Sequence, residues 1–167
     1  EWPLSPIPVL LHEKEWAQIC DGLSQRADLL EAVMADLYGP ARLLGEGHLP
    51  ASLIAENPGW ARQMGGVPPR GGQYLHFLSF EIGRSPDGSW LVLGDRTQAP
   101  SGAGFALENR MATSRIFPES FSGDRIHRLA GFFGDFRHAL DRLANRREGL
   151  PRRAGILTPG PANDAYF

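Results

Sequence analysis

The stretch from Asp95 to Arg110 gathers the residue types that bind metal ions and phosphate groups. It leads from the end of an expected strand, through a loop of proline, serine and glycine, into an expected helix. Backbone N–H groups at the start of a helix can face an anion. Oxygen ligands suit a hard divalent cation, and guanidinium groups bind phosphate or carboxylate. The candidates are Asp95, Glu108 and Asn109 for a metal and Arg96 and Arg110 for an anion.

The Gly102-Ala-Gly104 element does not match the nucleotide-binding motifs that it first suggests. A dinucleotide fingerprint needs glycine or alanine at position 107, which is Leu107 here. A P-loop needs a lysine beside the loop, and the only lysine of the chain is Lys14. Ser101 lacks the flanking glycines of a hydrolase nucleophile. The loop remains a candidate anion site.

Glu81 and Asp95 form the second candidate site. They lie on two expected strands joined by Arg84-Ser-Pro-Asp-Gly88, whose residues are typical of a tight connection. Two carboxylates on adjacent strands can hold a divalent cation against a polyphosphate. The alternative is that Glu81 is a solvated edge residue paired with Arg84 or Arg96.

The histidines do not follow a metal-binding pattern. No two are three or four residues apart, and Cys20 is the only cysteine. His127 and His138 lie on one expected helix, close to a common face. We interpret all of them as surface or capping residues: His12, His48, His76, His127 and His138.

The elements that must position these residues follow from periodicity and from glycine and proline. Apolar residues at helical spacing predict a helix over about 13–37, which Tyr38-Gly39-Pro40 ends. The first ten residues hold three prolines and should be extended. The fold class is therefore α+β. The remaining expectations are short helical pieces over 41–64, a loop over 65–72, strands over 74–82 and 90–93, helices over 104–117 and 125–145, a short buried strand from Ala154, and packing by Trp2, Leu4, Ile7, Trp16, Trp60, Phe132, Phe133 and Phe136.

Composition limits the class of protein. The chain has 167 residues, of which 42% are hydrophobic and 22% charged, so it can bury a core as ordinary globular proteins do. A net charge of −2 gives no general attraction to nucleic acid or anionic membranes. No apolar run is long enough to span a membrane, and no signal peptide is visible. We expect a cytoplasmic protein, because a lone cysteine fits a reducing compartment. A start without Met and an abrupt end predict a piece of a longer protein.

Long ordered motifs carry a resemblance to a known family. The chain resembles the circularly permuted ATP-grasp proteins of bacteria, essentially from end to end. The motifs are Trp-Pro-Leu-Ser-Pro-Ile-Pro (2–8), Gly-Leu-Ser-Gln-Arg-Ala (22–27), Asp-Leu-Tyr-Gly-Pro (36–40), Asp-Gly-Ser-Trp-Leu-Val-Leu-Gly-Asp-Arg-Thr-Gln-Ala-Pro-Ser-Gly-Ala-Gly (87–104), Leu-Glu-Asn-Arg (107–110) and Leu-Thr-Pro-Gly-Pro-Ala-Asn-Asp-Ala-Tyr-Phe (157–167).

This resemblance implies a reaction and a set of roles. ATP-grasp enzymes use Mg-ATP to phosphorylate a carboxylate, and an amine or similar nucleophile then attacks the acyl phosphate. The expected product class is peptide-like, and the expected partners are a carboxylate and an amine substrate and the remaining ATP-grasp lobe. The implied site residues are Glu81 and Asp95 for magnesium, Arg84, Arg96 and Arg110 for phosphate or acyl phosphate, and Ser101, Gly102 and Asn109 for the nucleotide.

The resemblance also implies a division of the chain and one departure. Residues 1–72 would form a helical segment, 73–150 the permuted strand pair with helices, and 151–167 the start of a further unit. The nucleotide-cradling segments would follow residue 167. Many relatives have Glu-Asp-Asn where this chain has Gly94-Asp95-Arg96, so a metal ligand is missing and a cation takes its place.

Two other functions stay open. The chain could be a non-catalytic, degenerate ATP-grasp interaction module with residues 13–64 as its contact surface. It could also be a small anion-binding domain that works through the turn at 100–104.

Overall fold

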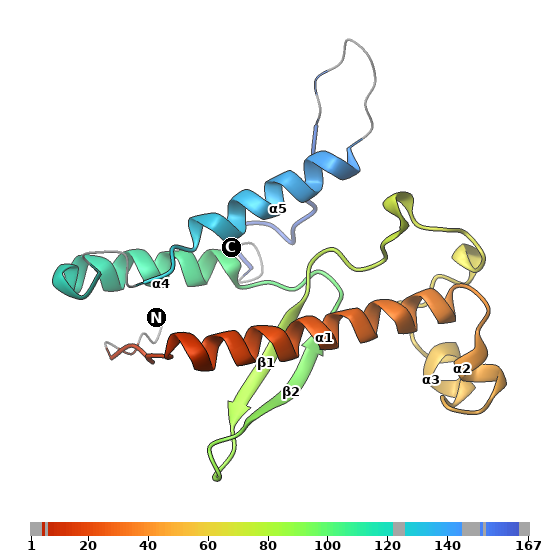
Figure 1. Cartoon of the computed structure of the whole chain (residues 1–167). Helices are drawn as coiled ribbons and strands as arrows, with labels where there is room; N and C mark the ends of the chain where they lie inside the picture. The colour runs from red at the N-terminus through yellow and green to blue at the C-terminus, as the bar shows by residue number, and fades with distance from the viewer. Residues whose placement is uncertain (1–4, 6, 122–125, 145–150, 152, 164–167) are drawn as a thin grey trace. The chain divides into compact units, whose positions relative to one another are not determined.

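The computed structural model describes all residues except 1–4, 6, 122–125, 145–150, 152 and 164–167 (Figure 1). The chain forms two compact units. Residues 11–98 are called the hairpin unit, and residues 1–10 with 99–167 are called the helical unit. Helices and a two-stranded antiparallel sheet confirm the predicted α+β class. The predicted division at 72/73 and 150/151 stays a prediction.

Helix α1 (Glu13–Leu37) is the longest element of the hairpin unit, and it confirms the helix predicted over 13–37. Glu13 and Glu15 in its first turn suit the positive end of the helix dipole. The helix ends where the chain reaches Tyr38-Gly39-Pro40, and the Tyr38 N–H still bonds the Met34 carbonyl at 3.0 Å. Proline cannot continue a helix, which explains the stop.

Short helical pieces follow α1, as predicted for 41–64. Tyr38 joins them to the rest of the unit: its ring stacks on Trp60 at 4.2 Å and on Tyr74 at 5.8 Å. Its hydroxyl accepts the Ala61 N–H at 3.2 Å. The predicted packing role of Trp60 is confirmed. The pieces are α2 (Arg42–Gly45), α3 (Ala51–Ala55), η1 (Arg62–Met64) and, within the predicted loop, η2 (Arg70–Gly72).

The predicted hairpin is confirmed as β1 (Ser79–Arg84) and β2 (Trp90–Arg96). The first strand begins at residue 79 and not at 74 as predicted, and the second continues three residues beyond the predicted end at 93. Its turn is fixed by Asp87, whose carboxylate accepts the Ser89 N–H at 3.0 Å and the Ser89 hydroxyl at 2.7 Å. Gly88 has a φ of +86°, a left-handed conformation that favours glycine.

A bulge interrupts the pairing of the two strands. Ile82 lies opposite Val92, but Glu81 lies opposite Gly94, so Leu93 is an extra residue on β2. Opposed residues share a face of a sheet and successive residues alternate. Asp95, opposite Phe80, therefore shares the face of Ile82, whereas Glu81 is on the other face.

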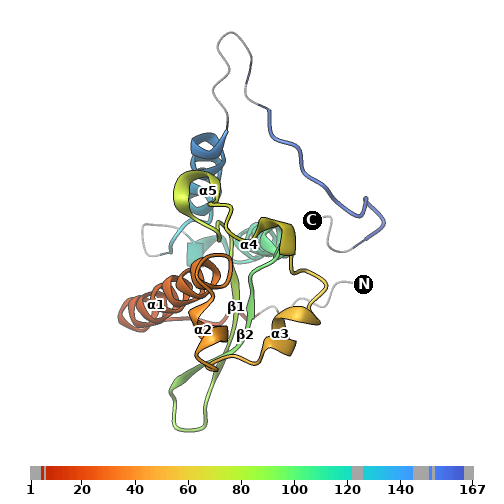
Figure 2. The same ribbon diagram turned by 90° about the vertical axis from the view of Figure 1, so that its right-hand side faces the viewer.

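Helix α1 lies across the face of the hairpin that carries Asp95, as Figures 1 and 2 show. Among the described residues only Ile19 and Leu75 are buried hydrophobic side chains, at 6% and 8% exposure. The Glu31 carboxylate of α1 accepts the N–H groups of Tyr74 and Leu75, each at 2.8 Å. The hairpin unit is thus held by hydrogen bonds and ion pairs around a small apolar centre. Trp16 is 42% exposed and contributes less packing than predicted.

The helical unit contains α4 (Ala103–Ile116), η3 (Pro118–Phe121) and α5 (Ala130–Leu143). The helix predicted over 104–117 is confirmed. The one predicted over 125–145 begins later, so His127 precedes it; residues 125 and 145 lie outside the described part. All five histidines are exposed, as predicted.

Three packing predictions in the helical unit are wrong. Phe132 is 45% exposed and Phe133 and Phe136 are only half-buried, because α5 buries none of its residues. The strand expected from Ala154 is an extended segment without strand pairing, and Ile156 and Leu157 are exposed.

The packing predicted for the first ten residues is wrong for Ile7, which is 79% exposed. Trp2 and Leu4 lie outside the described residues. Amphipathic spacing marks an apolar face, but burial needs a second surface to cover it.

No helix in the part of the chain that the structure describes is long and apolar enough to cross a membrane.

Candidate functional site

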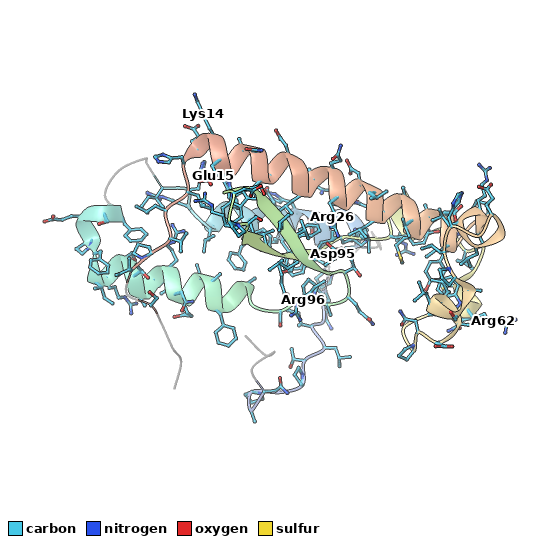
Figure 3. All side chains as sticks on the ribbon, turned by 90° about the horizontal axis from the view of Figure 1, so that it is seen from below. Lys14, Glu15, Arg26, Arg62, Asp95 and Arg96 are labelled. Carbon is cyan, nitrogen blue, oxygen red and sulfur yellow. The ribbon has the colours of Figure 1, made fainter. Side chains whose placement is uncertain are left out.

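Asp95 is held by Arg26 from α1. The Arg26 Nε donates to Oδ1 at 2.7 Å and Nη2 donates to Oδ2 at 2.8 Å, so both carboxylate oxygens are engaged. Figure 3 shows the two side chains between the helix and the end of β2. Their side chains are 41% and 21% exposed, respectively. Such a two-pronged contact fixes direction as well as distance, because the guanidinium is planar.

This contact changes the acidity of both groups. Hydrogen bonds and charge from Arg26 keep the pKa of the Asp95 carboxyl below its ordinary value, against a smaller opposing effect of desolvation. Asp95 raises the pKa of Arg26 in turn. Asp95 is therefore an anion with a resident counter-ion.

Glu81 lies on the opposite face of the hairpin and is paired with Arg96. The Arg96 Nε donates to Glu81 Oε1 at 2.9 Å, and Nη2 contacts the same oxygen. Both side chains are more than half exposed, at 63% for Arg96 and 52% for Glu81. A Cβ at Gly94 would lie 3.4 Å from Glu81 Oε2, so the missing side chain leaves the other carboxylate oxygen open. Glu81 is thus a solvated residue paired with Arg96, as the alternative interpretation of the sequence expected.

Arg84 is engaged at the other end of the hairpin. Its guanidinium forms an ion pair with Glu15 of α1 and lies 4.9 Å from the Trp90 ring centroid. The Trp90 indole N–H donates to Glu15 at 3.0 Å. Arg84 is 52% exposed, so one side of the guanidinium faces solvent.

Glu15 and Arg26 are functional candidates that the sequence analysis missed. They lie eleven residues apart on α1, which is about three turns and returns to the same helical face. Ile19 and Gly22 lie on this face between them. Together they line one wall of a groove of about 850 Å³ between α1 and the hairpin, with Trp90 and Val92 on the other wall. The signal that could have found them is their spacing, which places two charged residues on the apolar face of a predicted helix. The single lysine, Lys14, is exposed and points away from the hairpin (Figure 3).

The remaining predicted residues belong to the helical unit. Gly102 precedes α4 with a φ of +107°, and no side chain caps the helix there. Ser101 is exposed. The Asn109 backbone carbonyl accepts the Thr113 hydroxyl at 2.7 Å. Arg110 donates to the His127 carbonyl at 3.3 Å and lies 5.4 Å from the Phe121 ring.

A divalent cation shared by Glu81 and Asp95 does not fit this arrangement. The two carboxylates are on opposite faces of a strand pair, and each already has a guanidinium partner. Among the residues that the structure describes, no group of three or more histidine, cysteine or acidic side chains is placed to hold a metal ion. The metal role of Glu81 and Asp95 stays a prediction from the sequence.

Comparison with known proteins gives a match over almost the whole chain. Residues 8–167 match the family described as circularly permuted ATP-grasp type 2. The match includes α1, both strands and α4, so it covers every predicted site residue.

Similar proteins occur in bacteria and are longer than this chain. An uncharacterized protein of Mycobacterium leprae is 32% identical over 166 residues, which is 99% of this chain and 29% of that protein. An uncharacterized protein of Synechocystis is 31% identical over 166 residues, which is 99% of this chain and 34% of that one. A third, from Mycobacterium tuberculosis, is 38% identical over 120 residues, 72% of this chain and 14% of its own length. The chain thus spans about a third or less of the curated relatives it matches.

Proposed function

This chain belongs to the circularly permuted ATP-grasp type 2 family, and we propose that it contributes to an enzyme that joins a carboxylate to an amine at the expense of ATP. The observation that carries the proposal is the family match over residues 8–167. The superfamily is of the ATP-dependent ligase type. The substrates of this protein are proposed only by class.

The proposed reaction has two steps. A substrate carboxylate oxygen attacks the γ-phosphorus of ATP, and ADP leaves. The amine nitrogen then attacks the acyl carbon, the bond from that carbon to the phosphate oxygen breaks so that phosphate leaves, and the nitrogen loses a proton. Both steps place negative charge on phosphoryl oxygens, and fixed cations stabilise that charge most where water is excluded.

We assign a cationic role to three arginines: Arg84, Arg96 and Arg110. Arg84 and Arg96 lie at opposite ends and on opposite faces of the hairpin, so they would contact different groups of the substrates. Arg84 and Arg96 are more than half exposed, so an incoming phosphate can reach them. Each would exchange a carboxylate partner, Glu15 or Glu81, for phosphate oxygens of the same charge. Arg110 contacts a backbone carbonyl and an aromatic ring and has no carboxylate partner among the described residues, so it loses less on such an exchange.

The proposed nucleotide contacts are the loop before α4 and Asn109. Gly102 leaves the amides at the start of α4 without a side-chain cap, which suits a phosphate oxygen. Mg²⁺ is expected in the family reaction, and one ion held jointly by Glu81 and Asp95 is not part of this proposal. We propose that the additional length of the relatives supplies the adenine pocket, and that the reaction takes place in the cytoplasm.

The test is ADP formation in a protein that joins this chain to the additional region found in its relatives. With a carboxylate and an amine present, Arg96→Gln and Arg84→Gln should each lower the rate at least tenfold. Arg62→Gln is the control, because Arg62 is an exposed arginine on η1 and forms no ion pair among the described residues. Equal rates in all four proteins would contradict the arginine roles. Absence of Mg-ATP-dependent ADP formation in the unchanged protein would contradict the ligase proposal itself.

A second function is favoured by the ion pairs of the hairpin. Carboxylates neutralised by arginine are poor metal ligands, so the chain could serve as a non-catalytic module within the family. Calorimetric titration of Mg-ATP distinguishes the two: binding by the longer protein supports the ligase, and lack of binding with retained fold supports the module.

A further inference from the structure

The two hairpin carboxylates are separated by the geometry of the sheet. Phe80 and Asp95 face each other across the strands, as do Glu81 and Gly94. Neighbouring pairs in a ladder project to opposite faces. Contacts agree with the register, because Asp95 reaches α1 whereas Glu81 contacts Arg96 of the neighbouring strand. A single ion cannot bind both carboxylates without a change of register.

Each carboxylate already has a cation in hydrogen-bonding range. Arg26 uses both oxygens of Asp95, and Arg96 uses one oxygen of Glu81. A divalent cation at Asp95 would have to displace Arg26 and then lie beside its positive charge. Like charges at such short range repel strongly where solvent is partly excluded.

Two sets of polar contacts join α1 to the hairpin within the part of the chain that the structure describes, and the Asp95 contact is one of them. Arg26 fastens the end of β2, and Glu15 fastens the beginning of β2 through the Trp90 N–H and the end of β1 through Arg84. The apolar lining of the groove between these contacts combines the buried Ile19 with half-buried residues such as Ile82 and Val92 and with the exposed Leu29 and Leu91. With little burial available, the two polar contacts fix the direction of the helix across the strands.

We infer that the hairpin carboxylates are counter-ions of arginines and not joint ligands of one metal ion, and that Asp95 acts with Arg26 to fasten the end of β2 to α1. The inference concerns this chain alone and does not depend on the ligase activity.

A double-mutant cycle tests the contact in the full chain. Asp95→Asn should lower the urea midpoint of unfolding in the unchanged protein, and in an Arg26→Gln background its effect should be about half or less. Arg26→Lys keeps the charge and serves if the glutamine variant does not fold. Arg62→Gln is the matched control and should leave the effect of Asp95→Asn unchanged. Equal effects of Asp95→Asn in the presence and absence of Arg26 would overturn the inference.

A Mn²⁺ titration followed by water proton relaxation tests the metal. Mn²⁺ accepts the same oxygen ligands as Mg²⁺ and reports its own binding. The unchanged chain, Glu81→Gln and Asp95→Asn should give the same weak response. A stoichiometric Mn²⁺ site that both substitutions abolish would show a joint metal site and overturn the inference.

Discussion

Arg26 of α1 holds both carboxylate oxygens of Asp95 across 69 residues of sequence, at 2.7 and 2.8 Å. The contact joins the middle of α1 to the end of β2, just before the loop that leads to α4. A helix and a hairpin that share few buried side chains depend on such contacts for their relative placement.

Replacement of Arg26 by lysine or glutamine should separate the shape of the guanidinium from its charge. Lysine keeps the positive charge but loses the two-pronged shape of the guanidinium, which we call the fork. The melting temperature of Arg26→Lys should therefore lie between those of the unchanged protein and Arg26→Gln. We expect a fall in melting temperature of roughly 1–4 °C for glutamine, measured by circular dichroism. High salt should reduce the difference. Equal melting temperatures for the lysine and glutamine variants would show that charge without the fork contributes nothing, and a lysine variant as stable as the unchanged protein would show that the fork contributes nothing.

Asp87 should make the hairpin turn sensitive to acid. The Ser89 N–H, and then its hydroxyl, lower the pKa of the Asp87 carboxyl below its ordinary value. A depressed folded-state pKa adds stability above the unfolded value, near 4, and this stability is lost as the pH falls through the folded value. An asparagine at position 87 does not titrate. The stability that Asp87→Asn loses relative to the unchanged protein should therefore shrink below about pH 4. A deficit that stays constant from pH 7 to pH 3 would contradict this assignment.

Glu31 should contribute through two backbone amides. Its oxygens accept the N–H groups of Tyr74 and Leu75 at 2.8 Å each, and removal of both acceptors leaves these donors without a partner. Glu31→Ala should cost about 1–3 kcal/mol of unfolding free energy. Glu31→Gln keeps one acceptor oxygen and should cost less. Urea unfolding measures the cost of both substitutions. An equal cost for alanine and glutamine would mean that the hydrogen bond which the glutamine oxygen can keep adds nothing to stability.

Two glycines should respond to alanine with opposite signs. Gly22 lies within α1 with open space around it, so Gly22→Ala should stabilise the protein by about 0.5–1 kcal/mol. Gly102 has a φ of +107°, and Gly102→Ala should cost about 1–3 kcal/mol. Thermal unfolding of both variants checks the signs. A stabilising Gly102→Ala would mean that the loop takes another conformation.

The local elements could be predicted because their signals are local. Apolar spacing and the Tyr38-Gly39-Pro40 sequence define α1 almost to the residue. The turn residues between Arg84 and Gly88 define the hairpin. Family motifs spread over the chain were sufficient to predict the family.

The placement of site residues could not be predicted in the same way. Arg26 and Glu15 meet partners 69 and 75 residues away, and sequence spacing says nothing of such pairs. The bulge at Leu93 lies beside Gly94, and a glycine inside a strand can mark a bulge, but it does not say which residue is skipped, and that choice sets the face of Asp95. The phenylalanines of α5 have core spacing, but only a covering surface makes an apolar face a core.

The unpaired Leu93 makes the hairpin sensitive to a slip of one residue. If β2 paired with β1 without skipping Leu93, Asp95 would lie opposite Ser79 and on the side of Glu81. The two acids would then be diagonal neighbours, and Arg26 would face a different side chain. The position of the bulge in β2 therefore decides whether Asp95 binds Arg26 of α1 or lies beside Glu81 on the other face of the sheet.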